Sequence, residues 1–396
     1  MKDKEYYNEK ARELHRELPG KLETSSPYVI TSHEELSTVY SPGVAAPCSD
    51  IAKDTERAYE YTMKGRTVAV ISDGSAVLGL GNIGPEAALP VMEGKAMLFK
   101  QFAGLDAVPL CLQTQDVDEI VAIVKALSPT FGGINLEDIS APRCFEIEER
   151  LQDIGIPVFH DDQHGTAIVT LAGLMNATKV TGKKLEDMKI VMQGAGAAGV
   201  AIARLLSCHY DDVDESTCQS ISRIIMCDSR GIIHSKRDDL NDTKRDMLAY
   251  TNPDDMEGSL SDALIDADVF IGVSVGDSLT EEMVASMAEN PIIFALANPT
   301  PEIDPDTAKH AGASIIATGR SDYPNQVNNV LAFPGIFKGA LAIRAPRITT
   351  QMKYRAAEAL AGLVDNPTPD MIIPDPFDER VPDAIAQAII DSQEKI

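Results

Sequence analysis

Short apolar runs alternate with longer amphipathic segments along most of this chain. Runs of a length typical of buried strands are expected at 67–72, 107–113, 131–136, 156–160, 188–193, 223–227, 268–273, 291–296 and 314–317. Helical periodicity lies between them, as at 86–101, 116–127 and 166–180. Strands that alternate with helices are typical of parallel sheets covered by helices. The pattern therefore predicts an α/β fold with two parallel-sheet domains, the second of the Rossmann type.

The two ends of the chain have a different pattern. A charged helix is expected at 3–18, ended by Pro19-Gly20, and prolines 27, 42 and 47 then predict an irregular stretch. Loops are expected at 209–220 and 365–379, and further helices at 335–345 and 352–364. We expect a first domain over 1–165, with 335–396 packing back onto it, and a second domain over 166–334.

A glycine motif follows the strand expected at 188–193. It reads Gly194-Ala195-Gly196-Ala197-Ala198-Gly199 and leads directly into an apolar helix. In this context Gly194 permits a tight turn, Gly196 lets the backbone approach a pyrophosphate, and Gly199 lets the helix pack closely. The helix start attracts the anion. All six residues are therefore expected to bind a dinucleotide, the alternative being a tight turn without a ligand.

The next expected strand ends on Asp228. An acid there accepts hydrogen bonds from the adenosine ribose and disfavours a 2′-phosphate, which favours NAD over NADP. The cations Arg230, Lys236 and Arg237 lie nearby and keep NADP possible. The alternative is that Asp228 is only a turn residue at the strand end.

A second motif of the same form spans Gly79 to Gly84. Five residues separate it from the end of its strand, and Pro85 opens the following helix. This spacing fits phosphate binding less well. We interpret the segment as a loop that shapes the site.

Acidic pairs follow two expected strands, Glu137-Asp138 after 131–136 and Asp161-Asp162 after 156–160. The carboxyl ends of parallel strands are where α/β proteins place their sites, and clustered carboxylates suit Mg²⁺ or Mn²⁺. Consecutive strand residues point to opposite faces, so Glu137 and Asp138 converge on one ion only if the strand has ended. Otherwise one of them caps the following helix.

Composition narrows the class of partner. The net charge is −26 and 44% of the 396 residues are apolar, as in an ordinary soluble protein. Such an acidic chain argues against nucleic acid and against an anionic membrane as partners. It does not exclude an anionic substrate, because a metal ion dominates the field inside a cleft.

The six cysteines form no C-x-x-C pair, and Cys111 and Cys227 lie in apolar runs. Buried reduced thiols are expected, and a structural zinc is not. The amino terminus lacks the apolar core of a signal peptide, and no apolar run reaches about 18 residues. The expected location is the cytoplasm.

Several segments carry a specific resemblance, in consistent order along roughly 30–345. They are Tyr40-Ser-Pro-Gly-Val-Ala, Glu93-Gly-Lys95-Ala-Met-Leu, Asn135-Leu-Glu137-Asp138-Ile, His160-Asp161-Asp162-Gln-His-Gly-Thr-Ala, Ala297-Asn298-Pro-Thr and Ala317-Thr-Gly-Arg-Ser-Asp-Tyr-Pro-Asn-Gln-Val-Asn-Asn329. Together they resemble the malic enzyme family, in its short bacterial and archaeal form. Taken alone, Lys95 would be interpreted as a surface lysine and Tyr40 as a packing residue.

The resemblance implies metal-dependent oxidative decarboxylation of (S)-malate to pyruvate and CO2, with reduction of NAD or NADP. Lys95 would be the general base on the C2 hydroxyl, and Tyr40 would protonate C3 of the enol intermediate. A cation beside Lys95 would push it toward the neutral form that a base needs. The remaining implied roles are metal binding for Glu137, Asp138 and Asp162, a place beside the metal for Asp161, and malate or nicotinamide-ribose binding for Asn298 and Asn329.

One departure concerns the loop 73–79, where the long forms of the family carry an arginine and this chain has none. The group that binds the malate carboxylate is therefore left open. A homodimer is expected. The alternatives are malate-to-lactate conversion or oxaloacetate decarboxylation on the same scaffold, a nucleotide-sensing protein with an inactive site, and an amino-acid dehydrogenase.

Overall fold

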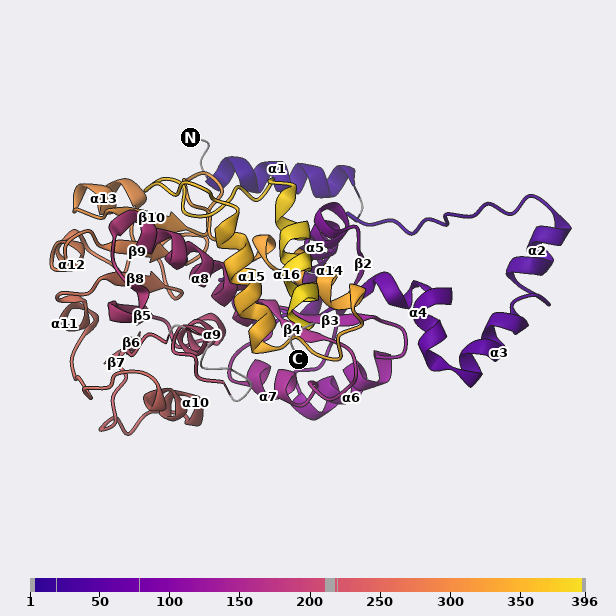
Figure 1. Cartoon of the computed structure of the whole chain (residues 1–396), viewed down its shortest axis with the longest axis horizontal. Coiled ribbons are helices and arrows are strands. Elements are labelled where there is room, and N and C mark those ends of the chain that lie inside the picture. Colours follow the sequence, from indigo (N-terminus) through magenta and orange to yellow (C-terminus); the bar gives the residue numbers. More distant parts are fainter. Residues whose placement is uncertain (1–3, 19, 78, 211–217, 219, 394–396) are drawn as a thin grey trace.

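The computed structural model describes residues 4–18, 20–77, 79–210, 218 and 220–393 (Figure 1). Residue 3, Pro19, Leu78 and most of the loop expected at 209–220 lie outside these ranges. The first parallel sheet lies at the centre of the view and the second at the left, with the last three helices in front of the first.

The first sheet has the order β2-β1-β3-β4, with all strands parallel. The strands are β1 (Thr67–Ser72), β2 (Asp106–Cys111), β3 (Gly133–Leu136) and β4 (Val158–His160). Each matches an expected strand, with ends that move by one or two residues. The helices between them are α5 (Pro85–Leu98), α6 (Val117–Leu127) and α7 (Arg143–Glu149). Every residue of β1 is buried, as its continuous apolar sequence predicts.

The second sheet has the order β10-β9-β8-β5-β6-β7. Its strands are β5 (Lys189–Gln193), β6 (Arg223–Asp228), β7 (Gly231–Ile232), β8 (Val269–Gly272), β9 (Ile292–Ala295) and β10 (Ile315–Thr318). All neighbouring strands are parallel except β6 and β7, which are antiparallel. The strand β7 has only two residues, and the sequence pattern did not predict it. The helices of this domain are α9 (Ala197–Leu206), α10 (Asp242–Asp246), α11 (Leu260–Leu264), α12 (Glu281–Ala285) and α13 (Pro305–His310).

One long helix, α8 (Asp161–Thr181), joins the two sheets. It packs against α9 of the second domain and against α15 (Thr350–Gly362). The remaining carboxyl-terminal helices are α14 (Phe333–Ala342) and α16 (Arg380–Gln393). Phe337 of α14 lies edge-on against Phe99 and Phe159, which belong to the first domain. The boundary expected at residue 165 falls inside α8, and one continuous apolar core crosses it.

The amino-terminal part is more helical than expected. After α1 (Lys4–Glu17), the structure has α2 (His33–Val39), α3 (Ala45–Lys53) and α4 (Ala58–Tyr61). The prediction of an irregular stretch from its prolines was wrong here. Ser32 and Glu35 form a reciprocal capping box at the start of α2, and Pro47 lies in the first turn of α3, where its missing N–H costs nothing.

This amino-terminal part also leaves the body of the protein. We define the arm as residues 22–62; it projects to the right in Figure 1 as α2 and α3. The backbone N–H of Lys21 donates to Glu93 at 2.9 Å just before the arm begins, and Lys64 donates to backbone carbonyls of the first domain just after it ends. No residue of the arm is buried.

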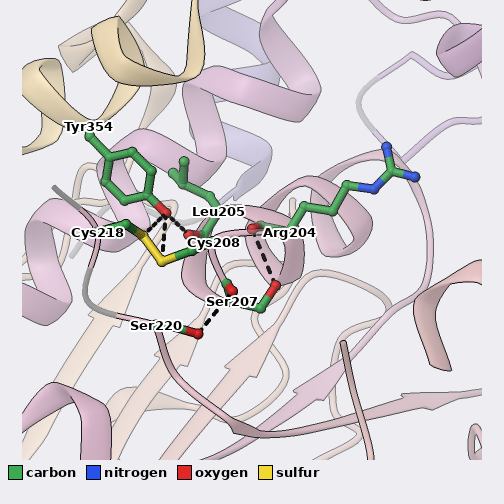
Figure 2. Close-up of a disulfide and its surroundings, with 7 residues drawn as sticks. All are labelled: Arg204, Leu205, Ser207, Cys208, Cys218, Ser220 and Tyr354. Atoms are coloured by element: carbon green, nitrogen blue, oxygen red, sulfur yellow. Dashed lines mark hydrogen bonds between the residues drawn. A yellow bond between two sulfur atoms is a disulfide. The ribbon is translucent and has the colours of Figure 1, made fainter. Parts of the chain in front are cut away.

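Cys208 and Cys218 form a disulfide, which the sequence analysis did not anticipate (Figure 2). The Cys218 sulfur and the backbone carbonyl of Leu205 both lie within hydrogen-bond distance of the Tyr354 hydroxyl on α15. Cys111 and Cys227 are free thiols, as predicted, although Cys111 is only half-buried. Among the described residues, no helix is both long and apolar enough to cross a membrane.

Candidate active site

The carboxylates that follow β3 and β4 come together at one edge of the first sheet. Glu137, Asp138 and Asp162 each place one carboxylate oxygen within 4.8 Å of the others. Asp138 has a φ of +54°, so the chain turns immediately after the strand. Its backbone N–H donates to the Asp162 carboxylate at 2.8 Å. This turn removes the obstacle that a regular strand would pose to convergence, because the two neighbouring side chains no longer alternate.

The three carboxylates are costly to hold together without a cation. Burial raises the pKa of Glu137 to about 7, although Lys95 opposes the shift. Burial likewise raises the pKa of Asp162 to about 6. Oxygen donors in a compact, partly buried acidic group are the ligands of hard divalent cations. The donor set thus fits Mg²⁺ or Mn²⁺.

Lys95 lies beside these carboxylates, on α5. Its Nζ is 2.5 Å from Asp161 Oδ2 and 3.0 Å from Glu137 Oε1, and the side chain is only 7% exposed. The ammonium also lies 4.1 Å from the ring centroid of Phe333. Burial alone would lower the pKa of Lys95, but Asp161 and Glu137 raise it overall. The protein groups alone therefore favour a protonated Lys95, and not the neutral lysine expected beside a cation.

Asp161 is completely buried and is the short-range partner of Lys95. Burial raises its pKa to about 7, against the lowering effects of Lys95 and a hydrogen bond from Asn329. Gly165 lies one turn further along α8. A Cβ there would lie 2.0 Å from Asp161 Oδ1 and 3.0 Å from the Asn329 Cβ, so only glycine fits.

The two asparagines expected to bind malate or the nicotinamide ribose lie on different segments. Asn329 begins the short helix Asn329–Leu331 and contacts the Asp161 region. Asn298 follows β9, and its backbone carbonyl oxygen would lie 2.6 Å from a Cβ at Gly79. The second glycine motif therefore packs against a predicted site residue, which supports its interpretation as a loop that shapes the site.

The first glycine motif has the predicted strand–turn–helix setting. Gly194 has a φ of +120°, and a Cβ on it would lie 2.9 Å from the Val273 carbonyl oxygen. A Cβ on Gly199 would lie 1.9 Å from the carbonyl oxygen of Gly194. Gly196 precedes α9, and nothing lies within 4 Å of where its Cβ would be. Each glycine thus has the setting that the motif predicts: Gly194 makes the tight turn, Gly196 leaves the approach open, and Gly199 allows close packing.

Asp228 is already occupied by partners within the chain. Arg237 donates to both of its oxygens, at 2.8 and 2.9 Å, Lys244 donates at 2.5 Å, and the Arg230 backbone N–H donates at 2.9 Å. Burial works against ionisation, yet Arg237 and Lys244 lower the pKa of Asp228 to about 2. The sequence analysis noted Arg237 as a nearby cation but missed Lys244, which is 16 positions away and comes close only because α10 folds back.

Of the two predicted catalytic residues, Tyr40 lies away from the lysine–carboxylate cluster. It ends α2 on the arm and is 69% exposed, whereas Lys95 lies on α5. Figure 1 shows α2 far from α5. Within a single chain, the structure does not bring Tyr40 to Lys95.

The structure also identifies two positioning residues that the sequence analysis missed. Asn135 donates to Glu137 Oε2 at 2.8 Å. Arg143 donates to Asp73 at 2.8 Å and to Ser75 at 2.9 Å in the loop that lacks the long-form arginine. A polar residue inside an apolar strand was a usable signal for Asn135. No local signal pointed to Arg143, because its partners lie about 70 residues earlier in the chain.

The fold and the site together define a two-domain α/β protein with a Rossmann-type domain beside a lysine–carboxylate cluster. Residues 163–391 match the model of the malic enzyme NAD-binding domain, and 19–116 and 110–152 match that of the malic enzyme N-terminal domain. The chain belongs to the malic enzyme family.

Known relatives agree with this assignment. The chain is 59% identical to the bifunctional malic/malolactic enzyme of Bacillus subtilis, covering 96% of this chain and 92% of that protein. It is 48% identical to the NADP-dependent malic enzyme of Halomonas elongata, covering 95% and 91%. The crystal structure of the NAD-dependent malic enzyme from Thermotoga maritima is 50% identical, with a TM-score of 0.91 and coverage of 96% and 98%.

Proposed function

We propose that this protein catalyses the divalent-metal-dependent oxidative decarboxylation of (S)-malate to pyruvate and CO2, with reduction of NAD or NADP. The observation that carries the proposal is the cluster in which Lys95 contacts Glu137 and Asp161 beside Asp138 and Asp162. An inactive nucleotide sensor would have no need to keep so many buried charges together, because each costs free energy.

Glu137, Asp138 and Asp162 would hold the metal ion. When bound, a divalent cation supplies Lewis-acid chemistry at the malate oxygens and at the enolate that forms after CO2 leaves. The protein groups supply the proton transfers. Lys95 Nζ would accept the proton of the C2 hydroxyl, and Asp161, 2.5 Å away, would stabilise the resulting ammonium. Asn329 and Asn298 would orient malate and the nicotinamide ribose.

A homodimer would complete the site. The arm buries none of its own residues, although it exposes many apolar side chains, among them Tyr28, Val29, Ile30, Leu36, Val39 and Tyr40. A helical segment of this kind is stabilised by packing against another surface rather than by its own propensity. We propose that the arm packs on a second copy of the chain and places Tyr40 in the site of that copy, as the proton donor to C3.

NAD is the proposed preferred cofactor, although the relatives include both NAD- and NADP-dependent enzymes. In the proposed binding mode a 2′-phosphate would approach the negative charge of Asp228, which Arg237 and Lys244 compensate. Removing Asp228 would leave Lys244 without its carboxylate partner and Arg237 with Asp239 alone, so that a phosphate could take the place of Asp228. The variant Asp228→Ala should therefore lose NAD affinity and gain NADP affinity, so that the ratio of the two kcat/KM values moves toward NADP by about tenfold or more.

The test of the cofactor assignment is a pair of initial-rate series with NAD and NADP. Asp239→Ala is a matched control, because Asp239 also pairs with Arg237 but lies outside the strand end. An unchanged NAD-to-NADP ratio in Asp228→Ala would contradict the role of Asp228.

Malate-to-lactate conversion is a second candidate on the same site, because the Bacillus relative is named as a bifunctional malic/malolactic enzyme. In that reaction the reduced cofactor is consumed again. Net NADH and lactate, measured in the same assay, therefore separate the two activities.

The primary test is the initial-rate absorbance of reduced nicotinamide with (S)-malate, Mn²⁺ and either cofactor, with pyruvate measured in parallel and a chelator as control. We expect chelator-sensitive reduction with an equal yield of pyruvate. Folded protein that binds the cofactor but reduces none of it and forms neither pyruvate nor lactate would refute the proposed function.

A further inference from the structure

A cavity of about 790 Å³ lies between the two domains, apart from the lysine–carboxylate cluster. Its walls come from α7, the start of α8, α9, α10 and the start of α15. None of the residues assigned above to malate, metal or dinucleotide lines it. Its volume is in the range of small-molecule sites, and domain interfaces are where such sites are common.

Four cations line this cavity: Arg143 on α7, Arg204 on α9, Arg347 before α15, and Lys353 on α15. Arg143 is paired with Asp73. Arg204 and Arg347 have no carboxylate partner among the described residues, although the chain carries a net charge of −26 and most of its described arginines form ion pairs. Figure 2 shows the Arg204 side chain extending from α9 away from the disulfide. Two arginines that lack carboxylate partners in one cavity of an acidic protein indicate an anionic ligand.

The floor of the cavity is formed by a network of buried polar side chains. Lys353 Nζ lies 3.1 Å from His164 Nδ1, and His164 Nε2 lies 2.9 Å from Glu148 Oε2. An ammonium can only donate, so Nδ1 accepts and the Nε2–H donates to Glu148. Lys353, His164 and Glu148 are each less than 10% exposed. A buried ammonium at a cavity wall attracts an anionic ligand more strongly than one surrounded by water.

The same hydrogen-bond network extends from Glu148 to the residues that would hold the metal. Glu148 Oε1 accepts from the backbone N–H of His160 at 2.9 Å, and Oε2 is within 3.1 Å of Gln163 Nε2. His160 is the N-cap of α8 and has no side-chain cap of its own. Glu148 therefore fixes the first turn of α8, the turn that carries Asp161 and Asp162.

Acidic side chains limit the kind of anion. Glu146, Glu149, Asp242 and Asp246 line the α7 and α10 walls. Of these four, only Glu146 has an ion-pair partner within the described part of the chain. These carboxylates would repel an extended polyanion such as a nucleoside triphosphate. The cations thus suit a compact oxyanion.

We propose that this cavity is an effector site for a small oxyanion, a carboxylate or a phosphate-like group, bound by Arg204, Arg347 and Lys353. Binding draws Lys353 away from His164, which loosens the hold of Glu148 on the first turn of α8. Occupancy of the cavity consequently changes the affinity of Asp162 and its neighbours for the metal ion.

The binding step is tested by calorimetry on the full chain, without metal or malate. Sulfate and glutarate serve as probes for the two sources of oxyanion, and ATP as the polyanion that should be excluded. We expect one of the first two to bind, and the double variant Arg204→Ala/Arg347→Ala to bind it at least about tenfold more weakly. Arg223→Ala is the matched control, because Arg223 also has no ion-pair partner among the described residues but lies outside the cavity.

Binding of neither sulfate nor glutarate, or undiminished binding by the double variant, would overturn the effector site. Preferential binding of ATP would overturn the assignment to a small oxyanion. Basal kcat and KM for malate should be unchanged in the double variant, since neither arginine touches the proposed active site.

The coupling step is tested by Mn²⁺ affinity, followed by electron paramagnetic resonance with and without the probe that binds. We expect a change of about fivefold in the wild type. Glu148→Gln should still bind the probe but lose this response. A response that survives in Glu148→Gln would refute the assigned route. This step rests on the proposed metal site, whereas the calorimetry does not, so a failure of that site would be recognised as absent Mn²⁺ binding with probe binding intact.

Discussion

Lys95 and Tyr40 are implied by the same family resemblance, yet the structure gives them opposite settings. Lys95 is 7% exposed and lies between two carboxylates, in a body whose largest apolar cluster spans both domains. Tyr40 is 69% exposed and lies on an arm that buries nothing. One half of the predicted catalytic pair is thus assembled within the chain, and the other half is presented outward.

The difference teaches that the order of motifs along a sequence does not say whether their residues meet within one chain. Buried ionic groups need partners in the same fold, because an unpaired charge is too costly to bury. An exposed apolar helix has no such requirement within its own chain and is stabilised when it meets another surface. The predictions below test this division, beginning with the largest expected effect.

Replacing Lys95, the predicted catalytic residue that lies in the body of the protein, should abolish malate oxidation. We expect Lys95→Ala to lower kcat by about 10² to 10⁴-fold, the usual contribution of a general base, while the chain stays folded. Lys100→Ala is the control, because Lys100 is a nearby exposed lysine that pairs with Asp106. Near-normal turnover in a folded Lys95→Ala variant would refute the base assignment.

Mixing two inactive variants tests the arm. If Tyr40 acts on a second copy, a dimer of one Tyr40→Phe chain and one Lys95→Ala chain contains one intact site. Co-refolding equal amounts should then restore about a quarter of the wild-type activity, since half of the dimers are mixed and each has one good site. If Tyr40 acted within its own chain, the mixture would stay as inactive as its two components.

Charging the arm should separate the copies without unfolding either one. We expect Val29→Asp/Ile30→Asp to weaken the dimer by about a hundredfold or more, because each side chain would lose roughly 1.5 to 3 kcal/mol of burial at an interface. The melting temperature of the separated chain should hardly change, since the arm has no buried residue. Analytical ultracentrifugation would measure the dissociation constant of the dimer. Val275→Asp is the control, because Val275 is exposed and lies away from the arm. A dimer unaffected by the two charges would contradict the role of the arm.

The smallest expected effect concerns acid stability, which should depend on the body and not on the arm. The pKa of Asp228 is lowered to about 2, so its ion pairs contribute fully above the ordinary carboxyl pKa, near 4. This contribution is lost as the pH falls from about 4 to about 2. It should amount to about 1 kcal/mol, because solvent screening reduces the roughly 2 kcal/mol that the lowered pKa alone would give. Asp228→Asn should remove that part of the pH dependence of unfolding. If the free energy of unfolding falls equally with decreasing pH in both proteins, the ion pairs of Asp228 contribute nothing.

Much of the fold was predictable because its signals are local. Every expected strand is present within one or two residues, since continuous apolar runs between helices are typical of strands buried on both faces. The glycine motif predicted its own turn and helix start, and the acidic pairs predicted the carboxylate cluster. The arm helices, the two-residue strand β7 and the disulfide were missed, because they depend on caps and on a pairing that spacing alone does not specify. The roles of the site residues, the domain bounds and the cytoplasmic location stay predictions.

The sequence by itself determined the main strands, the helices between them and the residue types at their ends, because helix and strand periodicity, glycine turns and strand-end carboxylates are properties of neighbouring residues. Only the tertiary structure decided which distant groups meet. It brought Arg237 and Lys244 onto Asp228, Arg143 onto Asp73, and Lys353 onto His164 and Glu148. It also placed Tyr40 outside its own chain's site. Such contacts depend on how the two sheets and the last helices pack around one core, and short-range patterns carry no information about that packing.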